Sequence, residues 1–205
     1  MAKNKDKTEM IVTQALNELK LLDKRITKAI VNSEFVGYTV GGKMKNSFDP
    51  ETVKGKLTSI SDLIERRARI KALIYESNLK TKVTIGGKKM TVSEAILVKE
   101  NIPYKRKLLH TLKSQYETAE YRVNSENEEV NTRLDNQTSK FGEDKSKAKD
   151  IEEFSKNFIK MNGAELIDPA NIPEYTRKLD EELDTFENEV DFILSTSNAT
   201  TTISV

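Results

Sequence analysis

The chain has no cysteine and no tryptophan among its 205 residues, and it has one histidine. Without cysteine there is no disulfide, no thiolate zinc site and no cysteine nucleophile. The single histidine, His110, cannot supply the paired histidines of a di-metal bundle site, and no motif places a serine and an acid beside it. We interpret it as a helix-face residue. We therefore expect no metal, no cofactor and no enzymatic activity.

Long apolar segments are also missing. No run of 18 apolar residues occurs, so the sequence predicts no membrane-spanning helix and no membrane partner. The first seven residues, Met-Ala-Lys-Asn-Lys-Asp-Lys, are rich in lysine and lack the apolar stretch of a secretory signal peptide. We therefore expect a protein that is neither transmembrane nor secreted through a signal peptide.

Aromatic residues are scarce, at 6%, whereas charged residues make up 33% of the chain. This balance favours long helices that each bury one narrow apolar stripe. The net charge is +1, but residues 1–123 hold 25 Lys and Arg against 14 Asp and Glu, and residues 124–205 hold 9 against 19. The two halves either expose solvated faces of opposite sign or pack on each other, within a chain or between neighbours. No nucleic-acid reading motif accompanies the basic half, so nucleic acid is not an expected partner.

Apolar residues recur every three or four positions along several long segments. The first predicted helix covers 8–32, with Thr8 as its N-cap. The second begins at Asp49-Pro50, an N-cap followed by a proline at the first helical position, and ends near Asn78. Its predicted apolar face contains Val53, Leu57, Ile60, Ile64, Arg67 and Ile74, widened by Leu63, Ile70 and Leu73.

Two short β-type runs flank Gly-Gly pairs at a spacing of 45 residues: Tyr38-Thr-Val-Gly-Gly-Lys43 and Val83-Thr-Ile-Gly-Gly-Lys88. Each predicts a β-hairpin with a tight glycine turn. Because a single short hairpin is marginally stable in water, we expect the two to pair with each other or with another chain, at one end of a helical bundle.

The second half of the chain predicts further helices. Thr91 and Glu94 form a capping-box pattern that begins a third helix, which Pro103 either kinks or restarts and which continues as a coiled-coil-like heptad stripe to about Asn136. Residues 137–150 are polar and predict a linker. A short helix at 151–161, stopped by Asn162-Gly163, and a last helix from Tyr175 to Ile193 follow, and we expect an extended tail from Ser195 that docks onto a neighbour.

These elements predict three segments. Residues 1–136 would form a helix–hairpin–helix–hairpin–helix core, 137–150 a polar linker, and 151–205 the C-terminal helices and the extended tail, which pack on the core.

One segment matches the glycine and lysine spacing of a phosphate-binding loop, from Gly37 to Lys43. The next residue is Met44, where magnesium binding needs a hydroxyl, and the following helix begins only at Pro50. A hairpin turn is therefore the better interpretation of this segment.

Five basic residues could gather if the two hairpins lie side by side. In an oligomer, they would form a pocket for an anion together with turn amides. The alternative interpretation is that they are solvated residues of the hairpin tips. These candidate ligand-binding residues are Lys43, Lys45, Lys88, Lys89 and Arg106.

Two stretches carry a family resemblance. One runs from Asn78 through Gly87-Lys-Lys-Met-Thr-Val-Ser-Glu-Ala95 to Lys107-Leu108-Leu109, and the other from Leu179-Asp-Glu-Glu-Leu-Asp184 to Asn198-Ala-Thr200. They resemble the septicolysin-like family of small helical bacterial and phage proteins over about half of the chain. The sequence departs from that family at Ala199, where the family tends to have tryptophan. The resemblance implies a helical bundle with a small hairpin, no established activity and a phage-encoded protein.

Together these patterns predict a mainly α fold, an elongated bundle of long amphipathic helices with two short β-hairpins. The apolar stripes are too long for a small chain to cover alone, so we expect a homo-oligomer. The expected function is that of a non-enzymatic oligomeric structural or interaction protein, a bacteriophage virion component in the neck, tail, baseplate or capsid. Its partners would be further copies of itself and other phage structural proteins, in the virion or the host cytoplasm. The alternative is an oligomeric binder that sequesters an anionic small ligand such as a nucleotide signal.

Overall fold

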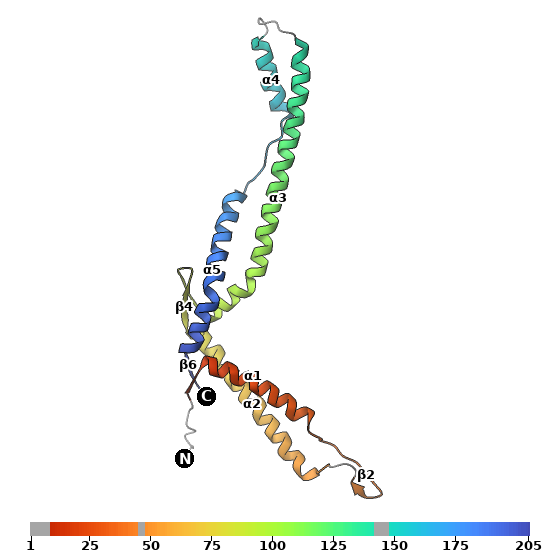
Figure 1. The fold of residues 1–205 in the computed structure, drawn as a ribbon, viewed down its shortest axis with the longest axis vertical. Helices are drawn as coiled ribbons and strands as arrows, with labels where there is room; N and C mark the ends of the chain where they lie inside the picture. Colours follow the sequence, from red (N-terminus) through yellow and green to blue (C-terminus); the bar gives the residue numbers. More distant parts are fainter. Residues whose placement is uncertain (1–8, 45–47, 142–147) are drawn as a thin grey trace. The chain divides into compact units, whose positions relative to one another are not determined.

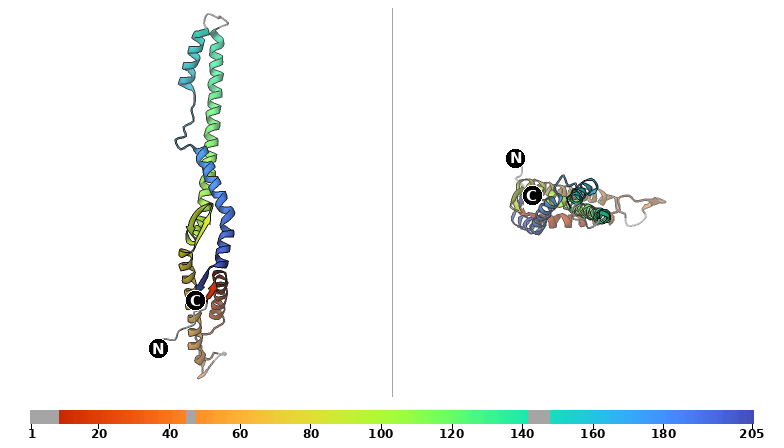
Figure 2. Two further views of the ribbon diagram at one scale, coloured as in Figure 1. Left: turned by 90° about the vertical axis from the view of Figure 1, so that its left-hand side faces the viewer. Right: turned by 90° about the horizontal axis from the view of Figure 1, so that it is seen from above.

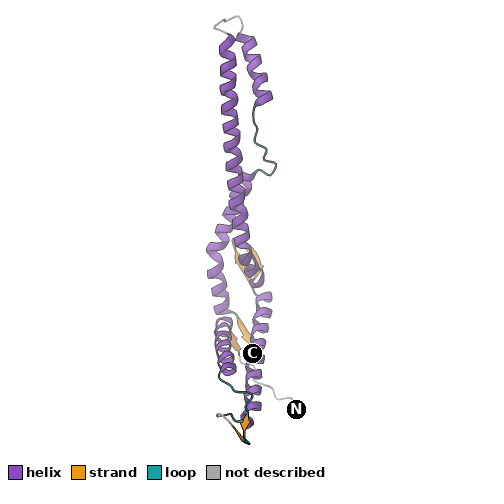
Figure 3. Ribbon diagram, turned by 90° about the vertical axis from the view of Figure 1, so that its right-hand side faces the viewer, coloured by secondary structure: helices purple, strands orange, loops and turns teal. Residues whose placement is uncertain are grey.

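The computed structural model describes residues 9–44, 48–141 and 148–205, and these are mainly α-helical, with short antiparallel strand pairs (Figures 1 and 3). The predicted fold class, mainly α with hairpins, is confirmed. The elements, in chain order, are β1 (Glu9–Ile11), α1 (Val12–Val31), β2 (Thr39–Val40), β3 (Lys43–Met44), α2 (Pro50–Lys80), β4 (Lys82–Ile85), β5 (Lys88–Thr91), α3 (Val92–Thr138), the 3-10 turn η1 (Ser139–Phe141), α4 (Ala148–Asn162), α5 (Ile172–Thr200) and β6 (Thr202–Ser204).

The chain forms two compact units. The first unit comprises Met1–Glu100 together with Thr185–Val205, and the second unit comprises residues 101–184. This grouping differs from the predicted segments, because the end of the chain returns to the N-terminal elements and both boundaries fall inside helices, α3 and α5. Among the described residues, no helix is both long and apolar enough to cross a lipid bilayer.

The first unit is built around the antiparallel pair α1 and α2, which lie side by side in Figures 1 and 2. On α1, three apolar residues at helical spacing, Val12, Ala15 and Leu22, are buried. Arg66 donates to Glu18 at 2.6 Å, and Arg67 pairs with Asp23, so ion pairs also join the two helices. The buried residues of this core are Val12, Ala15, Leu22, Ile70, Ile74 and Ile203.

The two ends of the chain differ from the prediction. Thr8, the expected N-cap, lies outside the described residues, and Glu9–Ile11 form a strand, so α1 begins at Val12. The expected tail from Ser195 is not extended at its start, because α5 continues to Thr200. The strand β6 that follows pairs antiparallel with β1 of the same chain, with Met10 opposite Ile203. The alternation of Ile203 between two polar residues explains this placement, since it lets one face of the strand enter the core.

The start of α2 is as predicted. The side chain of Asp49 accepts a hydrogen bond from the Glu51 amide at 3.0 Å, and Pro50 occupies the first turn. The capping box at the start of α3 is also confirmed. The Thr91 amide donates to the Glu94 carboxylate at 2.7 Å, and the Glu94 amide donates to the Thr91 hydroxyl at 3.1 Å.

Both predicted hairpins form, and in each the two turn glycines have positive φ: +58° and +78° at Gly41 and Gly42, and +56° and +72° at Gly86 and Gly87. Positive φ at both central residues is the geometry that glycine favours in a tight hairpin turn. The two hairpins do not pair with each other, because they belong to separate two-stranded sheets, and their pairing with another chain stays a prediction.

Their expected position at one end of the bundle is also wrong. The 31 residues of α2 separate β3 from β4 and span about 46 Å, whereas the connection from Met44 to Pro50 can reach only about 20 Å. The hairpins therefore lie near opposite ends of α2.

The second unit contains most of α3, all of α4 and the start of α5. Pro103 lies inside α3, which is one helix of 47 residues and does not restart there. The predicted linker at 137–150 is helical at both ends, since α3 and η1 continue to Phe141 and α4 begins at Ala148; residues 142–147 lie outside the described part. Near the end of α3, side-chain hydroxyl groups donate to backbone carbonyls of the preceding turn. For example, the Thr138 hydroxyl donates to the Leu134 carbonyl at 3.0 Å.

Helix α4 lies beside the end of α3 in Figures 1 and 2. It ends at Asn162, as predicted, and the Gly163 amide donates to the Ile159 carbonyl at 2.7 Å. The side-chain amide of Asn127 on α3 forms hydrogen bonds with the backbone of the segment that follows α4. It donates to the Ala164 carbonyl at 3.0 Å and accepts from the Ala164 amide at 2.8 Å.

Candidate interaction surface

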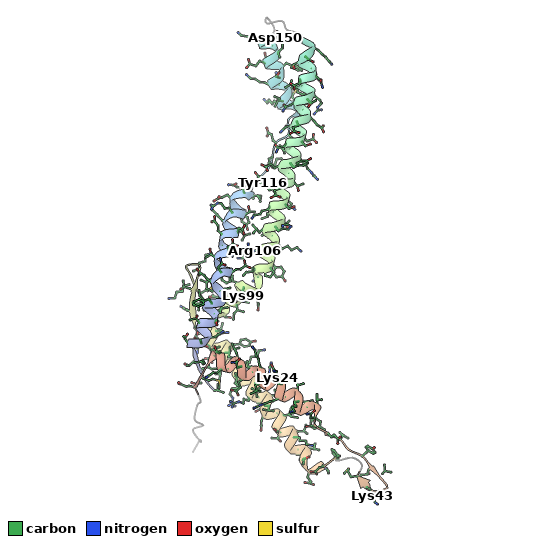
Figure 4. All side chains as sticks on the ribbon, in the orientation of Figure 1. Lys24, Lys43, Lys99, Arg106, Tyr116 and Asp150 are labelled. Atoms are coloured by element: carbon green, nitrogen blue, oxygen red, sulfur yellow. The ribbon has the colours of Figure 1, made fainter. Side chains whose placement is uncertain are left out.

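Within the first unit, the described lysines predicted to contribute to an anion pocket are not gathered in one place. Lys43 lies on β3, and Lys88 and Lys89 lie on β5, so α2 separates the two groups inside the first unit. Lys45 lies outside the described residues. Figure 4 shows Lys43 on the β2–β3 hairpin and Arg106 on α3. A pocket that uses both hairpins would therefore need a second chain.

Arg106 is already engaged by carboxylates of α5. Its guanidinium donates to Asp180 at 2.7 Å and also pairs with Asp184. The side chain of Arg106 keeps 34% of its surface exposed, but its two bound carboxylates would compete with any further anion. Its role in this structure is to join α3 to α5.

Within each unit, basic residues of α3 face acidic residues of α5. In the first unit Lys99 pairs with Asp191, and in the second unit Arg106 and Lys113 share Asp180, with Lys113 at 2.7 Å. The hydrogen bond from Lys113, followed by the smaller effect of Arg106, lowers the pKa of Asp180. These pairs join the basic half of the sequence to the acidic half. Of the two predicted arrangements, packing within a chain and packing between neighbours, they represent packing within a chain.

The spacing of charged residues in the sequence indicates these pairs, although it matches no known motif. Lys99, Arg106 and Lys113 recur every seven residues along α3, and Asp184 and Asp191 are seven residues apart on α5. A seven-residue period keeps side chains on one face of each helix, so matching periods of opposite charge indicate neighbouring helices. Because the pairs are partly exposed, each contributes little to the stability of the fold.

Two further chemical candidates from the sequence are Gly37 and His110. Gly37 of the phosphate-loop-like segment lies against the ring of Phe48, which occupies the space that a Cβ atom would need. His110 is an exposed residue on α3. In the described part of the chain, no three His, Cys, Asp or Glu side chains are grouped as a metal ion would require.

Each unit has an open groove. In the second unit a groove of about 610 Å³ is lined by α3, α4 and the segment after α4, including Asn131, Lys156 and Lys160. Lys156 is paired with Glu152 at 2.6 Å. In the first unit a groove of about 420 Å³ runs between α1 and α2, beside Leu21 and Leu63. Both linings mix apolar and charged side chains, and neither points to a particular ligand.

Exposed apolar side chains on the helices are the most extensive candidate surface. On α2 the prediction placed Leu57 and Ile64 on the same face as Ile60 and Ile74, but Leu57 is 51% and Ile64 47% exposed, whereas Ile60 and Ile74 are buried. The apolar residues of α2 cover more than one face, and α1 covers only one of them. In the second unit the exposed apolar residues are Tyr104, Leu108, Tyr121, Ile159, Met161, Ile167 and Tyr175.

Comparison with models of protein families, with curated proteins and with solved structures finds no match to this chain. The resemblance to the septicolysin-like family therefore rests on the two stretches quoted above and stays a prediction.

Proposed function

We propose that this chain is a non-enzymatic structural protein that associates with further copies of itself as a component of a bacteriophage particle. The observation that carries the proposal is the apolar surface of its helices. On α2 alone, Leu57, Ile64, Tyr75 and Leu79 expose between 47% and 64% of their surface. Contiguous apolar surface of this kind is typical of protein interfaces.

Apolar contact, more than charge, accounts best for the proposed association. The basic residues Lys99, Arg106 and Lys113 are paired with aspartates of the same chain, so this part of the charge asymmetry is already used. Association through apolar faces should persist at high salt, because screening weakens exposed ion pairs and leaves apolar burial intact.

Light scattering coupled to size-exclusion chromatography tests the association. We expect a mass that is a multiple of 23.3 kDa at micromolar concentration, unchanged in about 1 M NaCl. A chain that stays monomeric across the accessible concentration range would contradict the proposal.

The proposed setting, a phage particle, is supported by the family resemblance. It requires the chain to be present in purified virions of the phage that encodes it. Mass spectrometry of such particles should find the chain in a fixed ratio to other virion proteins, and its absence would reject the setting.

A further inference from the structure

Helix α2 carries two apolar stripes. The first faces α1 and contains Ile60, Leu63, Ile70, Leu73 and Ile74. The second follows the spacing 4-3-4-4-3-4, every one of its residues is exposed, and its centre lies about 140° around the helix from the first, at 100° per residue. We name this second stripe the outer stripe of α2; its residues are Leu57, Ser61, Ile64, Ala68, Ala72, Tyr75 and Leu79.

A helix at the surface of a protein normally has one apolar stripe, and a second stripe indicates a second packing partner. No described residue of the first unit covers the outer stripe, since its four large side chains are all about half exposed or more. One charged group lies against the stripe, since the Lys71 Nζ is 5.6 Å from the centre of the Tyr75 ring.

The outer stripe is complementary to itself. Its large residues lie toward the two ends and its small residues, Ala68 and Ala72, lie near the middle. If a second α2 runs antiparallel with Ala68 opposite Ala68, then Ile64 faces Ala72, Tyr75 faces Ser61, and Leu57 faces Leu79. Large residues then meet small ones across the centre, which is the condition for close helix packing.

Charge agrees with the same pairing on one side of the stripe, and on the other side Lys71 of each copy comes near Arg67 of the other, whose charge is already paired with Asp23. Glu65 and Arg69 border the outer stripe on one side of the helix. In the antiparallel arrangement centred on Ala68, Glu65 of each copy comes near Arg69 of the other. A two-fold axis repeats this favourable pair, as it repeats every contact of an isologous interface.

We propose that the outer stripe of α2 binds the outer stripe of a second copy of this chain, antiparallel, about a two-fold axis that passes close to Ala68. The contact spans about 33 Å of helix, from Leu57 to Leu79. The inference rests on the proposed function, because it names the surface and the partner through which the copies associate.

The absence of cysteine from the native sequence allows a direct test. A two-fold axis at Ala68 brings residue 68 of both copies together, so Ala68→Cys should form a covalent dimer under mild oxidation. The matched control is Ser114→Cys, a single cysteine at an exposed position of α3, which should stay uncrosslinked at the same protein concentration. A disulfide needs Cα atoms within about 7 Å, so crosslinking at 68 and not at 114 supports the axis.

Charge substitution gives a second test that does not depend on oxidation. Ala68→Glu and Ala68→Lys should each weaken dimerisation more than about tenfold, because the axis places two like charges against each other. Mixing the two variants should restore a dimer of one copy of each. The control pair Ser114→Glu and Ser114→Lys should leave the mass unchanged, and circular dichroism should show unchanged helix content in every variant.

The outcomes separate the two proposals. A monomeric wild-type chain overturns both the proposed function and this inference. An oligomeric wild-type chain whose mass is unaffected by both charge substitutions, or whose Ala68→Cys variant does not crosslink, overturns this inference and leaves the function standing. In that case another partner, or another part of the chain, covers the outer stripe.

Discussion

The two hairpins of this protein share a core sequence and a turn, yet they have different surroundings. Both use Thr-Val-Gly-Gly-Lys or Thr-Ile-Gly-Gly-Lys, and both have two turn glycines with positive φ. However, Ile85 of the β4–β5 hairpin is 1% exposed, whereas its counterpart Val40 in the β2–β3 hairpin is 56% exposed. The comparison shows that the local sequence determines the turn, whereas the elements packed around a hairpin determine its burial.

The difference arises from what surrounds each hairpin. Strands β4 and β5 have four residues each and connect directly to α2 and α3, and the turn amide of Gly86 donates to Glu189 of α5 at 2.7 Å. Strands β2 and β3 have two residues each. The β4–β5 hairpin is thus part of the first unit's packing, whereas the β2–β3 hairpin is held mainly by its own turn.

The largest expected difference between the hairpins comes from their apolar residues. Ile85→Ala should lower the free energy of unfolding by about 2–5 kcal/mol, because it removes a fully buried side chain and leaves a cavity. Val40→Ala should change it by less than about 0.5 kcal/mol, since the side chain is largely exposed. Chemical denaturation of both variants measures the contrast, and equal effects would contradict it.

The turn glycines should show a smaller difference. Neither Gly42 nor Gly87 has a neighbour within 4 Å of a Cβ position, so alanine there introduces backbone strain alone. Gly87→Ala should cost about 1–2 kcal/mol of global stability, because its hairpin is packed. Gly42→Ala should disturb its own hairpin, visible in NMR shifts of Thr39 to Met44, without moving the global transition. A shift of the melting temperature in both variants would show that the β2–β3 hairpin is coupled to the core.

The tether from α5 to one turn is a further point of difference. Glu189→Gln keeps the shape of the side chain and removes the charge from its hydrogen bond with the Gly86 amide. We expect faster hydrogen exchange at Gly86, with no change at Gly41, because hydrogen bonds to a charged acceptor are stronger than those to a neutral one. Unchanged protection of Gly86 would mean that Glu189 does not hold the turn.

The smallest expected effect is a pH dependence from the capping box where the β4–β5 hairpin leads into α3. The backbone amide of Thr91, and then its hydroxyl, lower the pKa of Glu94 from its ordinary value of 4.5. A group whose pKa is lower in the folded state stabilises the fold above its unfolded pKa, and this contribution is lost as the pH falls through the lowered folded value. Denaturation of the wild type should therefore become easier below about pH 4.5, and Glu94→Gln should flatten that part of the profile. A profile unchanged by the substitution would contradict the prediction.

Several features could be predicted from the sequence because they depend on residues close together in the chain. The Asp49 cap, the box between Thr91 and Glu94, and both glycine turns each involve groups within a few positions. Their hydrogen bonds and backbone angles are satisfied locally, whatever the rest of the molecule does.

The sequence predicted which residues of α2 are apolar, but it did not predict which of them are exposed. Helical spacing identified the apolar residues of α2, but it assigned Leu57 and Ile64 to the stripe that packs on α1. A helix with apolar residues over a wide arc has more than one possible contact face, and periodicity alone does not rank them. Which face is covered depends on where α1 lies.

By itself, the sequence determined that the chain is mainly helical, approximately where α2 and α3 begin and end, and that both Gly-Gly segments turn. Only the tertiary structure decided that the tail pairs with β1, that α5 supplies the partners of Lys99 and Arg106, and that one hairpin is buried. The physical reason is distance along the chain. Turns and caps are stabilised by neighbouring residues, whereas burial and ion pairing here join residues many tens of positions apart and depend on the arrangement of whole helices.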